Sequence, residues 1–216
     1  VSMSQILEAL ADNYQGHEVL RQQLLHQTPF FGNDDDQADG IMKQVYASLV
    51  RQIEGRESTK GRTYHLNMLS TTCHVYFGKM LGATPNGRLA HLPESDGTSP
   101  SHGADRNGPT AVVKSLAKMD QSLSGGTLLN QRFLPSALAG EEGIAKLAAL
   151  VRTYFRLGGH HIQFNVVDTE TLRKAQANPQ EYRDLLVRVA GYSDYFVNLD
   201  QYHQEEIIAR TAQETE

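Results

Sequence analysis

Apolar residues recur every three or four positions over much of the first third of the chain, a spacing that predicts helices. They form three stripes: Ile6, Leu7, Leu10 and Ala11; Leu20, Leu24 and Leu25; and Ile41, Val45, Leu49 and Ile53. Gly55 is expected to end the third helix. Residues 62–77 are instead rich in strand formers, including Thr71, Thr72 and Val75, and predict extended structure.

From residue 112 onward the pattern alternates between helix and strand. It predicts helices over 112–119 and 144–155, a strand over 127–135, and a final helix over 200–211. Gly158 is expected to stop the second of these helices, and Asp168 or Thr169 to cap the helix that follows residue 167. Helices alternating with strands predict the α/β class.

Residues 160–167 alternate strictly and predict a strand with two unlike faces. Three apolar residues share one face and three polar residues the other: Ile162, Phe164 and Val166 against His161, Gln163 and Asn165. His160 and His161 are neighbours, so their side chains point to opposite faces and are expected to be structural rather than to share a metal ion.

A long segment over residues 82–110 has many turn residues and no clear periodicity. It is not of low complexity, so we expect an ordered loop. Asp34, Asp35, Asp36 and Asp39 lie earlier, before the third predicted helix. Their spacing lacks the alternating pattern of a calcium loop, whereas acidic residues suit a helix N-terminus, which favours a capping role.

Composition narrows the functional class only a little. The formal net charge is -5 and no cluster of Lys and Arg occurs, which argues against nucleic acid binding. No apolar run is long enough to span a bilayer, and the start of the chain does not resemble a signal peptide. A single cysteine, Cys73, excludes an internal disulfide and a multi-cysteine metal site, so we expect a cytoplasmic location.

One short segment near the end of the chain carries a recognisable motif. Arg188-Val189-Ala190-Gly191-Tyr192 resembles the fingerprint of glycyl radical enzymes, the pyruvate formate-lyase superfamily. Four further blocks occur in the order that this family has, namely Asn107 to Ala111, Gly125 to Gln131, His161 to Val166 and Ile207 to Thr211. Within the superfamily the chain is similar to the trans-4-hydroxyproline dehydratase branch, with glycerol and propanediol dehydratases as near relatives.

The resemblance implies the C-terminal part of a ten-stranded α/β barrel, with flanking helices and a buried glycyl radical loop. Residues 1–80 would be a helical segment with the first strands leading into the barrel. Residues 81–216 would be the glycyl radical domain, with the radical loop near 187–196. The complete enzyme would be a lyase or dehydratase acting on a small hydroxylated substrate.

The resemblance also implies that Gly191 carries the radical. A radical on a backbone carbon is stabilised when that carbon is planar and conjugated with both flanking amides, and a Cβ would disturb this plane. The loop is expected to be supported by Arg188, Val189, Tyr192, Gln163 and Asn165. Burial among apolar and aromatic neighbours would protect the radical from dioxygen, these being Val189, Tyr192, Tyr195 and Phe196.

The resemblance implies that a separate radical-SAM activating enzyme removes the hydrogen atom from Gly191. S-adenosylmethionine and the [4Fe-4S] cluster would belong to that partner, and this chain would bind no metal. The family's thiyl cysteine lies in a Gly-Cys-Val-Glu-like loop that is not found here. Cys73 stands in a strand-like setting and is expected to be a small core residue. Residues that bind substrate are not assigned.

Three interpretations stay open at this stage: a piece of a complete enzyme, a separate radical subunit that completes a partner chain, or a remnant that is never activated. The chain opens inside a predicted helix, as if cut from a longer protein, which favours the first. Uncovered sheet edges and apolar faces would lead the chain to self-associate, or to rearrange relative to the complete enzyme. His203 departs from the family's pattern, where an apolar residue is usual.

Overall fold

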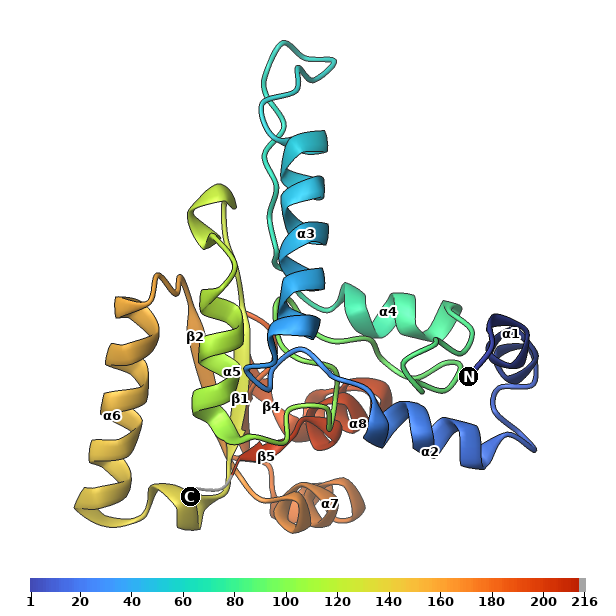
Figure 1. Ribbon diagram of the computed structural model, residues 1–216. Helices are drawn as coiled ribbons and strands as arrows, with labels where there is room; N and C mark the ends of the chain where they lie inside the picture. Colours follow the sequence, from blue (N-terminus) through green and yellow to red (C-terminus); the bar gives the residue numbers. More distant parts are fainter. Residues whose placement is uncertain (214–216) are drawn as a thin grey trace.

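The computed structural model describes residues 1–213 (Figure 1). Its α-helices are α1 (Met3–Ala11), α2 (Glu18–Gln27), α3 (Asp36–Ile53), α4 (Cys73–Met80), α5 (Gly108–Ala117), α6 (Gly140–Arg156), α7 (Thr169–Ala177) and α8 (Gln201–Ala209). Its strands are β1 (Leu129–Phe133), β2 (Ile162–Val166), β3 (Leu186–Arg188), β4 (Ser193–Tyr195) and β5 (Ala212–Gln213). None of the described helices is both long enough and apolar enough to cross a membrane.

Two small sheets organise the second half of the chain. β1 lies between β2 and β5 in a parallel sheet of order β2-β1-β5, and β3 and β4 form an antiparallel hairpin. In the β1–β2 register Asn130 stands beside Gln163 and Arg132 beside Asn165. α5 and α6 pack on this sheet through Val113, Leu116 and Tyr154. This confirms the α/β class, whereas the described residues form only five strands and no closed ten-stranded barrel.

The motif over residues 188–192 belongs to a second apolar core at the C-terminal end. α7, the β3–β4 hairpin and α8 bury Leu172, Val187, Val189, Phe196 and Ile207 against one another. Asp168 and Asp200 cap the two helices by accepting backbone N–H bonds, which confirms the first as the predicted cap. α7 and α8 therefore support the hairpin on its buried side.

The loop over residues 82–110 is ordered, as predicted, and fastens to the end of the chain. Asp105 accepts hydrogen bonds from Thr211 Oγ1 and, at 2.6 Å, from Gln213 Nε2. Burial of Asp105 is the main cause that raises the pKa of its carboxyl. Gly103 N also donates to Thr211 Oγ1, at 3.1 Å. The loop thereby holds the segment that contributes β5.

The acidic cluster before α3 caps this helix, as the sequence predicts. Asp35 Oδ1 accepts from the backbone N–H of Gln37 at 2.9 Å. Lys118 Nζ lies within 3.0 Å of carboxylate oxygens of Asp34, Asp36 and Asp39. Burial opposes the charge of this ammonium, but the three carboxylates outweigh it and raise the pKa of Lys118. An ammonium group therefore occupies the centre of the cluster.

α3 buries a different face from the one that its apolar stripe suggests. Ile41, Val45 and Leu49 are exposed, whereas Tyr46 on another face packs near Leu66 and Met119. Figure 1 shows α3 and the segment after it projecting away from the rest of the molecule. An apolar helix face is thus left uncovered in the described chain.

The strand prediction over residues 62–77 is wrong. This segment contains two isolated bridges, Glu57 with Thr63 and Met68 with Thr127, and α4 begins at Cys73. α4 packs close to the loop that follows, since a Cβ on Gly78 would meet Leu92 O at 2.4 Å. Cys73 is exposed at the start of this helix, so its expected role as a core residue is also wrong.

Candidate functional site

Gly191 lies at the tip of the β3–β4 hairpin. Val189 N donates to Tyr192 O at 2.9 Å, which leaves Ala190 and Gly191 as the two residues of the turn. Gly191 has φ of 83°, a left-handed conformation that glycine adopts without strain and other residues rarely do. The backbone conformation of the turn therefore favours a glycine at this position before any chemistry is considered.

The polar face of β2 supports the hairpin. Asn165 exchanges two hydrogen bonds with the backbone of Arg188, each of 2.8 Å. Gln163 Oε1 accepts from Gly191 N at 3.3 Å and from Arg188 Nε at 3.1 Å. Gln163 and Asn165 are buried, while Val166 on the apolar face is half exposed. The polar side of this strand is thus the inner side, because its amides satisfy the backbone of the hairpin.

Arg210, which follows α8, holds the same hairpin from another direction. It donates to Val189 O at 2.7 Å and to Arg188 O at 3.1 Å. Its guanidinium is paired with Glu206, which accepts at 2.9 Å and 2.8 Å. Burial alone would raise the pKa of Glu206, but the charge of Arg210 and the contacts with His102 and His74 hold it well below the ordinary value.

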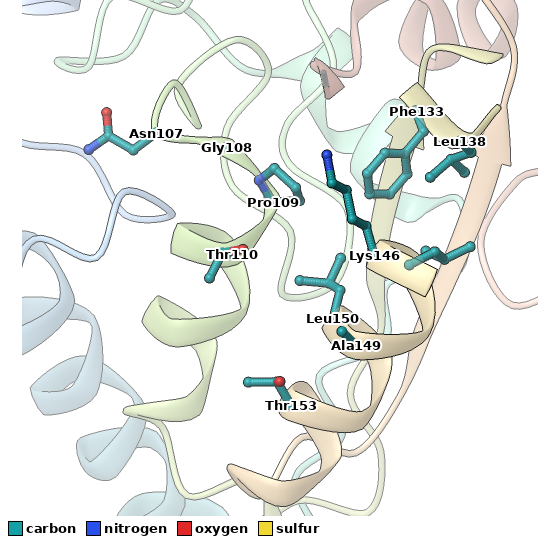
Figure 2. Close-up of a pocket in the computed structure, with 11 residues that line it drawn as sticks. Asn107, Gly108, Pro109, Thr110, Phe133, Leu138, Lys146, Ala149, Leu150 and Thr153 are labelled. Carbon is teal, nitrogen blue, oxygen red and sulfur yellow. The ribbon is translucent and has the colours of Figure 1, made fainter. Parts of the chain in front are cut away.

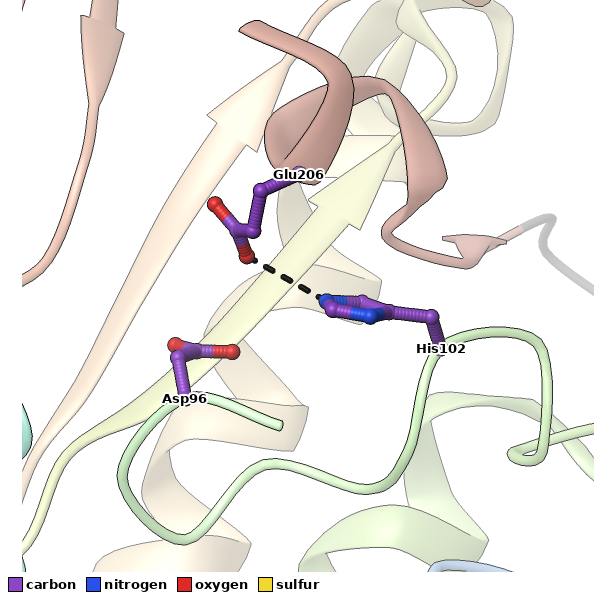
Figure 3. A group of neighbouring side chains, drawn as sticks. All are labelled: Asp96, His102 and Glu206. Atoms are coloured by element: carbon purple, nitrogen blue, oxygen red, sulfur yellow. Dashed lines mark hydrogen bonds and ion pairs between the residues drawn. The ribbon is translucent and has the colours of Figure 1, made fainter. Parts of the chain in front are cut away.

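Figure 3 shows Asp96, His102 and Glu206 pointing toward one another. Their possible ligand atoms all lie within 4.8 Å of one another. Among the described residues, this is the group that could hold a metal ion. His102 Nε2 lies 3.3 Å from Glu206 Oε1. His74 Nε2 lies 3.5 Å from the same oxygen, without hydrogen-bond geometry. A cation placed here would compete with Arg210, which already bonds both oxygens of Glu206.

The predicted burial of the radical loop holds only in part. Val189 and Phe196 are fully buried, whereas Gly191 is exposed and Tyr192 and Tyr195 are 37% and 45% exposed. The buried residues face α7 and α8, and the exposed ones lie on the outer side of the hairpin. Nothing in the described chain covers that outer side, so within these residues the loop is open to solvent.

A separate cavity of about 380 Å³ lies between the N-terminal end of α5 and α6, away from the hairpin (Figure 2). Pro109, Phe133, Leu138 and Leu150 give it largely apolar walls. Its lining, all of it within the described residues, includes no acid, histidine or cysteine. Lys146 is the one titratable residue in this lining, and no residue of the Gly191 hairpin contributes to the cavity.

All five predicted supporting residues meet at the hairpin, but sequence reasoning missed the groups behind them. Asn130 and Arg210 lie inside motif blocks to which no role was given, and both contact Val189 O. Asp96 and Glu206 lie outside any motif. A buried carboxylate has no local sequence signal, because its partners come from distant segments of the chain. His203, which departs from the family's pattern, is partly exposed and bonds Asp200 at 2.8 Å.

Two family models match the chain. The model described as glycine radical matches residues 94–197, and that described as pyruvate formate lyase-like matches residues 1–78. The first includes the Gly191 hairpin and the strands that support it. The chain belongs to the glycyl radical enzymes and corresponds to a C-terminal portion of them.

Individual relatives agree with this assignment. Trans-4-hydroxy-L-proline dehydratase of Clostridioides difficile is 54% identical over 98% of this chain, and isethionate sulfite-lyase of Bilophila wadsworthia is 43% identical over 98%. A crystal structure of the hydroxyproline dehydratase with its substrate bound superimposes on the whole chain with a TM-score of 0.97 at 52% identity. The chain spans only 27%, 26% and 27% of these proteins.

Proposed function

We propose that this chain is the radical-carrying part of a glycyl radical lyase or dehydratase, with the radical on Gly191. The observation that supports this most is the hairpin itself. Its tip has a glycine in a conformation that suits glycine, and that glycine's own N–H is held by a buried side chain. Loss of one hydrogen atom from Gly191 Cα leaves a carbon that conjugates with the amides on both sides.

The remainder of the enzyme would cover the outer side of the hairpin. Gly191 and the apolar face of α3 are both exposed, and the relatives are about four times as long as this chain. A covering segment would exclude dioxygen from the radical and bring the cysteine that accepts it. We place that cysteine outside these residues, since Cys73 lies at the exposed start of α4.

The reaction of the complete protein would be cleavage of a bond beside a substrate radical. Relatives named as a dehydratase and as a sulfite-lyase support this reaction class. A small hydroxylated substrate that loses water is the form we propose, with a radical-SAM enzyme as the activating partner. The exposed hairpin suits equally a separate subunit that docks on a partner chain carrying the cysteine.

The isolated chain is expected to self-associate. Its exposed apolar residues include three on α3 and Tyr76, Phe77 and Met80 on α4, and its three-stranded sheet has edges. Apolar patches and strand edges of this kind drive association in water. Sedimentation velocity should show dimers or larger species whose share rises with concentration. A single monomer at every concentration would contradict this prediction.

The proposed radical is tested by anaerobic activation followed by exposure to air. After incubation with a radical-SAM activating enzyme, S-adenosylmethionine and a reductant, the chain should give a glycine-type EPR doublet. Dioxygen should then cleave the backbone at Gly191, and mass spectrometry should find the fragment that ends beside it. Cleavage elsewhere, or an intact chain after loss of the doublet, would refute the assignment to Gly191.

A further inference from the structure

Gln163 continues beyond its contact with Gly191 into a chain of buried amides. Gln163 Nε2 donates to Asn130 Oδ1, and Asn130 Nδ2 donates to Asp96 Oδ2. The two amides meet because Asn130 and Gln163 are partners in the parallel register of β1 and β2. All three side chains are buried, with exposed fractions of 5%, 8% and 1%. A line of hydrogen bonds therefore runs from the Gly191 N–H to a buried carboxylate.

The groups at the two ends of this line fix the orientation of both amide side chains between them. A carboxylate only accepts hydrogen bonds, so Asn130 must turn its NH₂ group toward Asp96 and its oxygen toward Gln163. Gln163 must then donate to Asn130, which leaves its oxygen for Gly191 N and Arg188 Nε, and both of these can only donate. Rotating either amide by half a turn would place donor against donor or acceptor against acceptor.

Such a directed line changes the strength of its last bond. Each amide that donates to an acceptor becomes a better acceptor at its own oxygen, and this polarisation is larger in a buried setting. Gln163 Oε1 is thus a stronger acceptor than an isolated amide oxygen. A hydrogen bond accepted from Gly191 N–H makes that nitrogen richer in electrons and better able to delocalise an unpaired electron from the adjacent Cα.

We propose that Asp96, Asn130 and Gln163, here called the relay, are positioning residues. They align the Gly191 amide and stabilise the radical on its Cα. This inference rests on the proposed function, in which Gly191 carries the radical. The activating enzyme takes the hydrogen atom of Gly191 as a whole, one proton together with one electron. No proton is transferred along the three residues when the radical forms.

Two variants test the relay. Asp96→Asn keeps the shape and can still accept from Asn130, but it removes the charge that polarises the line. Gln163→Met keeps the length of the side chain and removes the acceptor for Gly191 N–H. Gln131→Met is the matched control, because Gln131 is buried on β1 and its amide donates to Pro109 O at 3.3 Å rather than to the hairpin.

The readout is the EPR spectrum and lifetime of the radical, with ¹⁵N-glycine incorporated and folding checked by thermal unfolding. Both relay variants should show a smaller ¹⁵N coupling, a wider proton splitting and a shorter lifetime. In Gln163→Met the lifetime should fall by about fivefold, as loss of the hydrogen bond from Gly191 N–H implies. Gln131→Met should match the wild type. If Asp96→Asn fails to fold, the spectrum and lifetime of Gln163→Met alone decide whether the relay stabilises the radical.

Wild-type couplings and lifetime in a folded Gln163→Met variant would overturn the relay and leave the proposed function standing. A wild-type chain that gives no doublet at all would instead contradict the proposed function, and the relay with it. The two failures are therefore told apart by the wild-type spectrum.

Discussion

Replacing Gly191 by alanine is expected to abolish the radical while the chain stays folded. The added Cβ has room, because its nearest contact would be Leu128 Cδ1 at 3.7 Å. The φ of 83° makes alanine strained there by about 1 kcal/mol, which lowers the melting temperature by about 2–4 °C in a chain of this size. The EPR doublet, in contrast, should disappear completely.

Gly158→Ala is the control for this variant. Gly158 also has a positive φ, of 94°, and no atom lies within 4 Å of a Cβ built on it. It should lose a similar amount of stability and keep the full doublet, because it lies in the turn after α6. A doublet that survives in Gly191→Ala, or that is lost in Gly158→Ala, would show that the radical is not carried by Gly191.

The second large effect concerns Glu206. Its side chain is buried and pairs with the buried Arg210, which holds the backbone of Val189 and Arg188. Glu206→Gln would remove the carboxylate that is paired with the buried guanidinium, at a cost of about 3–5 kcal/mol in the free energy of unfolding. Chemical denaturation should measure this loss.

Glu205→Gln provides the comparison, because Glu205 is 40% exposed and pairs with Arg173 on the surface at 2.5 Å. Such a pair contributes about 0–1 kcal/mol. If Glu206→Gln cost no more than Glu205→Gln, Arg210 and Glu206 would not hold the hairpin as described.

The same carboxylate predicts a dependence on pH. The pKa of Glu206 is well below its ordinary value of 4.5 in the folded chain, so its contribution to stability is complete above about pH 4.5. The contribution is lost as pH falls through the lower, folded value. The Glu206→Gln variant should therefore lose less stability than the wild type between neutral and strongly acidic pH.

Local patterns in the sequence predicted the elements that depend on local forces. The amphipathic helix over 144–155 is α6, the cap at Asp168 is present, and the strand over 160–167 is β2. α5 begins at Gly108, earlier than predicted, because Pro109 suits the first turn of a helix. The predicted strand over 127–135 is also confirmed, as the shorter β1.

The errors arose where distant parts of the chain decide the outcome. Thr71, Thr72 and Val75 favour a strand, but these three residues pair with no strand of the described chain, and the helix α4 that begins here contacts α8. β2 turns its polar side inward because the hairpin backbone needs Gln163 and Asn165. No periodicity within a segment can reveal either result.

The most direct test that the radical lies on a glycine Cα, which the alanine variant then assigns to Gly191, is EPR of the activated wild-type chain produced with α-deuterated glycine. A glycyl radical keeps one α-hydrogen, and the coupling to this proton splits the signal into two lines. Deuterium couples much more weakly, so the doublet should collapse to a single broad line in the labelled chain. A doublet that persists unchanged in the deuterated protein would place the radical on another residue and contradict the account.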